Sequence, residues 1–137
     1  MQTSENGIAF IKRNEGFASV PYNDNGHMAW GYGHDQEAGE PIPPSVTQEQ
    51  ATAILQNDLE TRYEPFVNKF IPDSCTQNQF DALVDFCYNL GEGALQTMLG
   101  HGWEQVPLQI PRWNHAAGVV NAGLTARRQA EVVLFNT

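Results

Sequence analysis

The spacing of apolar side chains changes twice along the chain, and this change restricts the fold more than any other feature. Apolar residues recur at helical intervals over residues 4–14, and again at steps of three and four from residue 47 onwards. Between these segments, residues 20–35 alternate aromatic side chains with proline, asparagine and glycine, which is typical of a short antiparallel sheet. We therefore expect an α+β fold, with a small antiparallel sheet lobe and a mostly helical lobe joined by a long helix.

Two capping sequences indicate where the predicted helices begin. Thr47-x-x-Gln50 and Thr76-x-x-Gln79 fit the capping box, in which each side chain binds the backbone of the other residue. The first opens the long helix, which Pro65 can bend or divide. The second opens a helix with a continuous apolar stripe. Shorter helices are expected over residues 94–99, 109–117 and 125–135.

Length, charge and cysteine content define the class of protein. The 137 residues are enough for one domain with its own core, so residues 1–137 are taken as a single domain and expected to be monomeric. Seven basic and sixteen acidic side chains leave a formal charge of −9, which disfavours a nucleic-acid partner. Cys75 and Cys87, twelve positions apart along a predicted helix, would lie roughly 16–18 Å apart, too far for a disulfide.

Two carboxylates of the N-terminal segment are candidates for chemistry. Glu15 ends the first predicted helix, and Asp24 follows nine residues later at a turn of the predicted hairpin. Carboxylates on different elements can face each other across a groove, as glycoside hydrolysis requires: one protonates the leaving oxygen while the other assists attack at the sugar carbon. Two ordinary surface acids would show the same spacing.

The segment from Glu15 to Asp35 resembles the catalytic segment of the phage-type lysozymes, the endolysin and muramidase family. The resemblance lies in the Glu-Gly pair, the Glu-x8-Asp spacing, the tyrosine before the aspartate and the closing Gly-x-Gly-His. Further matches follow in the family's order: Thr47-x-x-Gln50, TQNQFDALVDFCYNLGEG from residue 76, PRWN from residue 111 and GLTARRQAE from residue 123. Together these matches cover most of the chain.

This resemblance implies both a fold and an activity. It implies a lysozyme-like fold with a groove between the lobes, with Glu15 as general acid and Asp24 as the residue that orients or activates water. The implied substrate is bacterial peptidoglycan, hydrolysed with inversion at the β-1,4 bond between N-acetylmuramic acid and N-acetylglucosamine. No cofactor is implied, and the four histidines show no spacing typical of a metal site.

The chain departs from the family pattern at Ala29. The family has a threonine there, whose hydroxyl helps to hold the attacking water, whereas a methyl group cannot bind water. Hydrolysis is then slower, or His27 takes over the contact, or a sugar hydroxyl attacks instead and the enzyme is a transglycosylase. The segment from residue 93 to residue 107 is also shorter than usual, which would reduce one side of the helical lobe.

Two arginines are candidates for pairing with the acid. By resemblance, Arg127 or Arg128 lies against Glu15 and limits the cost of burying it. A surface pair between Arg127 and Glu131, one helical turn apart, is the alternative for these residues.

Three further residues are candidates for substrate binding. Tyr22 and Tyr32 could stack on sugar rings, although alternating aromatic residues of a hairpin equally belong to its core. Asn89 resembles a family position that faces the groove. A structural hydrogen bond is expected for His34, and a core position for Trp30.

Three functions remain open from the sequence. The first is a muramidase, the second a catalytically weak peptidoglycan-binding module of the same fold, and the third a transglycosylase. The N-terminus has only a five-residue apolar-leaning stretch, and no run reaches the length of a membrane span. We expect synthesis in the cytoplasm without a signal peptide or membrane insertion, and action on the wall after release.

Overall fold

The computed structural model describes all 137 residues, and α1 (Glu5–Glu15) leads directly into the sheet lobe. The three strands of this lobe are β1 (Ala18–Asp24), β2 (His27–Gly31) and β3 (His34–Asp35). The remaining helices are α2 (Gln48–Asp58), α3 (Glu64–Asn68), α4 (Gln77–Leu90), α5 (Glu92–Leu99), α6 (Val106–Gln109) and α7 (Ala122–Phe135). Short turns of other helix types are η1 (Leu59–Tyr63), η2 (Trp103–Gln105) and η3 (Ile110–Arg112), and a second hairpin consists of β4 (His115–Ala116) and β5 (Val119–Val120).

The sheet is antiparallel with strand order β1-β2-β3. Asn25 and Gly26 form the turn between β1 and β2 with φ angles of 51° and 98°, a left-handed backbone that asparagine and glycine tolerate. Ala29 lies opposite both Tyr22 of β1 and Asp35 of β3. Because directly paired residues point to the same face of a sheet, these three side chains form one row across the sheet.

The long helix is continuous but changes its hydrogen-bonding pattern halfway. Thr47 and Gln50 make both bonds of the predicted capping box at its start. The helix then passes through the π-helical turn η1, where the Glu64 N–H donates to the Leu59 carbonyl. Pro65 follows at the first turn of α3, where its missing N–H costs least. The predicted irregularity at Pro65 therefore takes the form of a π turn directly before it.

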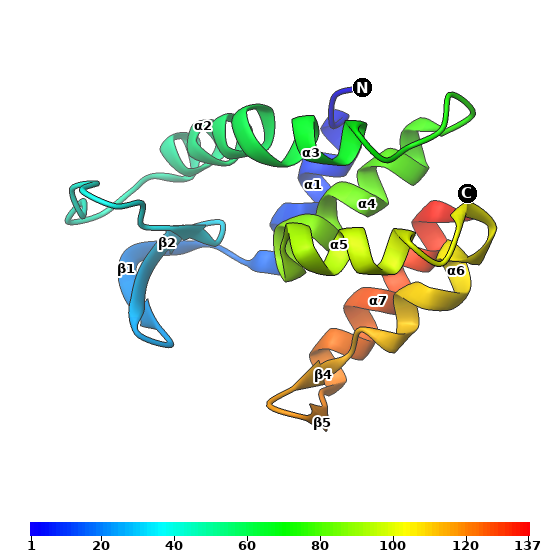
Figure 1. Cartoon of the computed structure of the whole chain (residues 1–137). Coiled ribbons are helices and arrows are strands. Elements are labelled where there is room, and N and C mark those ends of the chain that lie inside the picture. Colours follow the sequence, from blue (N-terminus) through cyan, green and yellow to red (C-terminus); the bar gives the residue numbers. More distant parts are fainter.

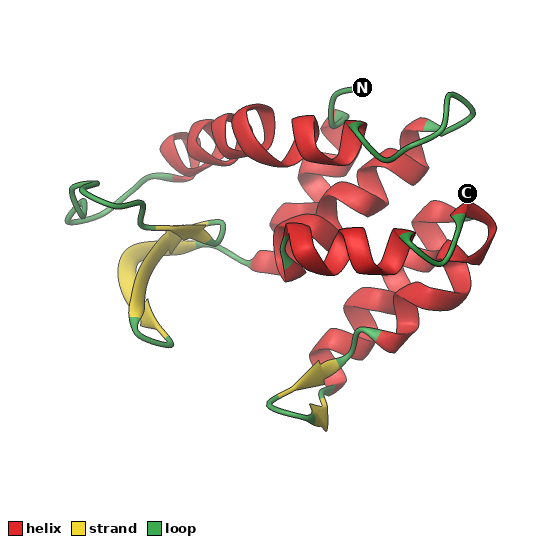
Figure 2. Ribbon diagram, in the orientation of Figure 1, coloured by secondary structure: helices red, strands yellow, loops and turns green.

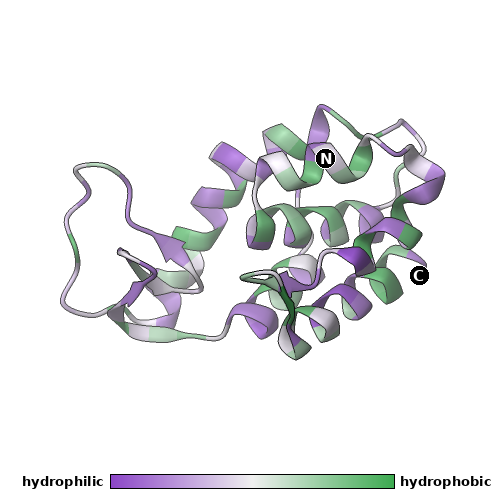
Figure 3. Cartoon of the chain, turned by 60° about the horizontal axis from the view of Figure 1, so that its bottom comes forward, coloured by the Kyte–Doolittle hydropathy of each residue, from purple (hydrophilic) through white to green (hydrophobic).

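Helix α4 is the centre of the helical lobe. Its residues from Phe80 to Cys87 are all buried, and it packs against α1, α5 and α7. Figure 3 shows that hydrophobic and hydrophilic residues alternate along the helices of the protein. Both cysteines are free, as expected from their spacing.

The lobes are arranged as the sequence predicted, because α2 begins beside the sheet and runs towards α3 at the helical lobe (Figure 1).

One prediction is wrong: residues 109–117 are not a helix. Helical structure ends with η3 at Arg112, and the next residue, Trp113, has non-helical φ and ψ angles of −92° and 59°. Ala117 and Gly118 then take positive φ angles of 52° and 78° and turn the chain between β4 and β5. Figure 2 shows this second hairpin apart from the sheet lobe and next to α7.

None of the helices combines the length and the apolar character that crossing a membrane requires. This finding agrees with the absence of a long apolar run in the sequence.

Candidate active site

Glu15 is the last residue of α1, and its side chain lies between α7 and the sheet lobe. Helix α1 stops there because Gly16 takes a φ of 71°, while its N–H still bonds to the Lys12 carbonyl. Glu15 Oε1 accepts a hydrogen bond of 2.9 Å from Arg127 Nη1. Its other oxygen, Oε2, faces Gly33, where an added Cβ atom would lie only 2.7 Å away. The absence of a side chain at Gly33 therefore makes room for this carboxyl group.

The surroundings of Glu15 favour its protonated form. The side chain is 18% exposed. Burial raises the pKa of Glu15 above its ordinary value of 4.5, and this effect outweighs the opposing charge and hydrogen bond of Arg127. The negative charges of Asp85 and Asp35 raise the pKa further. A carboxyl group of this kind can serve as a general acid at higher pH than an exposed glutamate.

Arg127 holds two carboxylates at once. Its Nε and Nη2 donate to the two oxygens of Asp85 at 3.0 and 2.9 Å, and its Nη1 donates to Glu15. Asp85 lies on α4 and is fully buried. Of the two arginines considered from the sequence, Arg127 is thus the one that contacts the acid.

Arg128 points into the core instead. Its Nη2 donates to Glu131 at 2.6 Å and to Asn89 at 2.8 Å, and its guanidinium lies over the Phe86 ring. Arg128 therefore does not pair with Glu15. Its hydrogen bond to Asn89 occupies the amide oxygen of that side chain. Burial raises the pKa of Glu131 well above its ordinary value, and the nearby Asp85 raises it further.

The face of the sheet that carries Asp24 also carries His27 and Asp35. His27 Nε2 lies 3.0 Å from Asp35 Oδ1 and 3.7 Å from Asp24 Oδ2. One ligand atom from each of the three residues lies within 4.8 Å of the others, so the group could hold a divalent ion. The absence of a metal site stays a prediction. His27, proposed to hold water, has its Nε2 directed between two carboxylates.

Tyr22 lies on the same face of the sheet as Asp24, two residues before it on β1. It is 43% exposed. Burial raises its pKa above 10.0, and the charges of Asp24 and Glu15 both add to the rise. Tyr22 therefore senses the charge of both acids and has ring surface open to a ligand.

Tyr32 and Ala29 are covered by their surroundings. Tyr32 is 9% exposed and packs against Phe17 with ring centroids 5.5 Å apart, so its ring belongs to the core. Ala29 is 1% exposed, and its neighbours in the same row are Tyr22 and Asp35. The polar group beside the alanine is thus the Asp35 carboxylate.

A hollow of about 550 Å³ lies next to Arg127. It is formed by the end of α1, the β4 strand and the start of α7, and its lining residues are Arg13, Asn14, Ala116, Asn121, Gly123, Leu124, Ala126 and Arg127. Its volume is within the range of small-ligand sites. Arg127, which lines it, also contacts Glu15, whereas Glu15 and Asp24 themselves do not line it.

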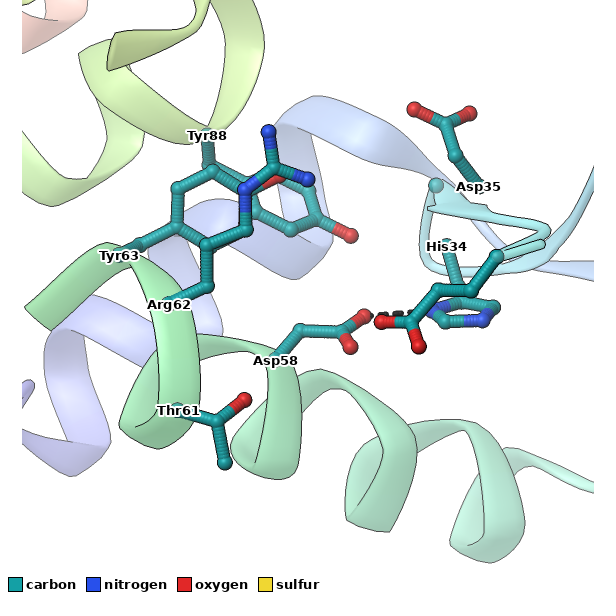
Figure 4. A pocket seen from close by; sticks show the side chains of 9 residues that line it. His34, Asp35, Asp58, Thr61, Arg62, Tyr63 and Tyr88 are labelled. Carbon is teal, nitrogen blue, oxygen red and sulfur yellow. Dashed lines mark hydrogen bonds and ion pairs between the residues drawn. The ribbon is translucent and has the colours of Figure 1, made fainter.

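A second pocket, between β3 and the long helix, has a structural role. Its volume of about 30 Å³ is enough for water but not for a sugar. Figure 4 shows His34 pointing towards Asp58 while its neighbour Asp35 points the other way. His34 lies 2.6 Å from Asp58 and 2.8 Å from Glu40, which confirms the expected structural hydrogen bond.

Two charged residues of this site, Asp35 and Asp85, were not predicted from the sequence. Glu131 was considered as a surface partner of Arg127, but it is buried and pairs with Arg128. A signal existed for Asp85, because a charged residue within the apolar stripe of α4 must be buried and paired. Asp35 and Glu131 had no such signal, since their positions depend on the register of β3 and on the docking of α7.

Comparison with known proteins identifies relatives over the whole chain. The family model described as "Phage lysozyme" matches residues 12–131. The endolysin of Bacillus phage PZA is 38% identical over all of this chain and 56% of its own length. The chain therefore spans little more than half of that relative.

Two solved structures are similar over almost their full length. An endolysin from Escherichia coli O157:H7 phage FAHEc1 has a TM-score of 0.85 and 34% identity, covering 98% of this chain and 93% of its own. The muramidase domain of SpmX from Asticaccaulis excentricus has a TM-score of 0.85 and 32% identity, covering 99% and 98%. With the family match over residues 12–131, these similarities show that the chain belongs to the phage lysozyme family.

Proposed function

We propose that the chain is a peptidoglycan-cleaving glycoside hydrolase, a lysozyme, with Glu15 as its general acid. The observation that carries the proposal is a largely buried carboxyl group with a raised pKa, held by Arg127 at the edge of the sheet lobe. Family membership supports the choice of peptidoglycan as substrate and of the cell wall as the place of action.

The two oxygens of Glu15 have different tasks in this proposal. Oε1 accepts the hydrogen bond from Arg127, so the proton belongs on Oε2, which faces Gly33 and the sheet lobe. The protonated oxygen donates to the glycosidic oxygen as the bond to the sugar carbon breaks. Arg127 then stabilises the carboxylate that remains.

Asp24 acts as the base that activates water. It lies at the end of β1 on the partly exposed face of the sheet. Attack by this water on the face of the sugar opposite to the leaving group inverts the anomeric centre. The bond cleaved is the β-1,4 bond from N-acetylmuramic acid to N-acetylglucosamine.

His27 and Asp35 take the place of the missing threonine hydroxyl. Both project from the same face of the sheet as Ala29 and Asp24, and the contact of 3.0 Å between them restrains the imidazole ring. With Nε2 engaged by Asp35, the other ring nitrogen, Nδ1, is left to hold the attacking water beside Asp24.

Replacement of the acid tests the proposal. Glu15→Gln keeps the size of the side chain but cannot donate an acidic proton, so release of reducing ends from purified peptidoglycan should fall by at least about a hundredfold. Glu49→Gln, the same change at an exposed position of α2, should leave the rate unchanged. Equal activity of Glu15→Gln and the unchanged protein would contradict the assignment.

Product analysis separates hydrolysis from the two alternatives. Mass spectrometry should find hydrolysed muropeptides that end in a reducing sugar. Anhydro-sugar or sugar-transfer products would identify a transglycosylase, which the alanine at position 29 makes a specific alternative. Binding to the wall without new reducing ends would identify a non-catalytic module.

A further inference from the structure

We propose that Asp85 is a positioning residue that controls the protonation of Glu15 by occupying most of the hydrogen-bonding capacity of Arg127. The proposal rests on the proposed function of Glu15 as the acid. Asp85 itself is fully buried in α4 and has no access to substrate, so it can act only through its neighbours.

The geometry of the guanidinium carries the argument. An arginine that faces a single carboxylate commonly binds it with two parallel hydrogen bonds and stabilises the ionised form. Here the parallel pair goes to Asp85, from Nε at 3.0 Å and Nη2 at 2.9 Å. Glu15 receives only one bond, from Nη1. Arg127 therefore holds Glu15 in position without giving it the full stabilisation of an ion pair.

Each element around Glu15 contributes a charged or titratable group. Helix α7 provides Arg127, α4 provides Asp85 and Tyr88, and the sheet provides Asp35 and Tyr22. Arg127 is the cation that lowers the pKa of Glu15, and Asp85 and Asp35 are the anions that raise it. Of these two anions, only Asp85 also binds the cation.

A second buried acid, Glu131, lies against Asp85. Glu131 Oε1 accepts from Arg128, whereas its Oε2 has no donor. A protonated Oε2 removes this deficit by donating to Asp85, and the raised pKa of Glu131 is consistent with that proton. In this arrangement Glu131 and Arg127 both donate to the oxygens of Asp85 and hold that side chain in place.

Neutralising Asp85 should therefore make Glu15 a stronger acid. Asp85→Asn removes one negative charge near Glu15 and leaves the Arg127 fork with only one acceptor oxygen. The guanidinium can then turn towards Glu15, whose ionised form gains stability. The alkaline limb of the pH profile of kcat/KM, which reports the acid in the free enzyme, should move down by about one pH unit. At pH values above the alkaline limbs of both proteins, a shift of one unit equals about a tenfold loss of kcat/KM in the variant.

Asp81 provides a matched control on the same helix. It lies one turn before Asp85, is equally buried, and accepts a hydrogen bond from Ser4, the N-cap residue of α1, instead of contacting the acid. Asp81→Asn should lower stability but leave the alkaline limb in place. Both variants and the unchanged protein are assayed on a soluble peptidoglycan fragment from pH 4 to pH 9, at a temperature where circular dichroism shows each to be folded.

Two outcomes decide the proposal. A limb that moves down for Asp85→Asn and stays for Asp81→Asn supports it, whereas a uniform loss of activity at all pH values would overturn it. Asp85→Ser removes the same charge and leaves room for a water molecule, so the same shift is expected if the asparagine variant does not fold. Failure here is distinct from failure of the proposed function, which would appear as activity in Glu15→Gln.

Discussion

Gly33 illustrates how a single position can matter to catalysis without any functional group. Its φ of +83° is strained for other residues, and a Cβ atom there would lie 2.7 Å from Glu15 Oε2. Gly33→Ala should displace the carboxyl group and lower kcat/KM at least about tenfold, since small misplacements at a reacting group are costly. The backbone strain should also lower the free energy of unfolding by about 1 kcal/mol.

Gly39 separates these two effects. It has a similar φ of +79° but no atom within 4 Å of an added Cβ. Gly39→Ala should therefore cost similar stability in urea unfolding and leave kcat/KM unchanged. Equal activity losses in both variants would show that backbone strain, and not contact with Glu15, is responsible.

At the residue scale, the sequence predicted the parts of the site that depend on local order. The positions of Glu15 at a helix end and Asp24 at a hairpin turn both follow from nearby turn residues. The choice of Arg127 over Arg128 could not be predicted, because adjacent helical residues point about 100° apart and only the docking of α7 decides which one meets the acid.

At the scale of elements, His34 joins strand β3 to helix α2 and to the loop that connects them. It is buried between Asp58 of α2 and Glu40 of the loop, and its hydrogen bond with Asp58 raises its pKa to about 9 from 6.5. Because the folded pKa is the higher one, this charge stabilises the fold fully below about pH 6.5. The contribution is lost as the pH rises through about 9.

Chemical denaturation at several pH values tests this connection. Between pH 6 and pH 10 the free energy of unfolding should fall by about 3 kcal/mol because of His34. His34→Asn should start from a lower stability and lose this part of the pH dependence. His115→Asn, at an exposed position of β4, should keep it. Parallel curves for all three proteins would contradict the role assigned to His34.

The elements that the sequence predicted well are those with signals at both ends. Helix α4 has a capping box at Thr76, an apolar stripe and a stop at Gly91, and all three are present in the structure. The hairpin of β4 and β5 has only two residues in each strand, so no alternation could reveal it. Its turn depends on a positive φ at Ala117, which the residue type does not indicate.

For the molecule as a whole, the formal charge of −9 should govern how the protein approaches intact cells. Bacterial walls often carry anionic polymers, and at about 10 mM salt charges repel each other over about 30 Å, compared with about 8 Å at 150 mM. Lysis of whole cells should therefore become several times faster as salt rises over this range. Cleavage of a small uncharged fragment should not change, and a parallel response of both substrates would contradict this explanation.

The contact between Glu15 and Arg127 joins residues 112 positions apart, near opposite ends of the chain. During synthesis, the N-terminal helix and the sheet leave the ribosome long before α7 is made. A nascent or prematurely terminated polypeptide therefore has the acid but not the arginine that holds it. The environment of Glu15 is therefore complete only after α7 has been made and has docked against α1 and the sheet lobe.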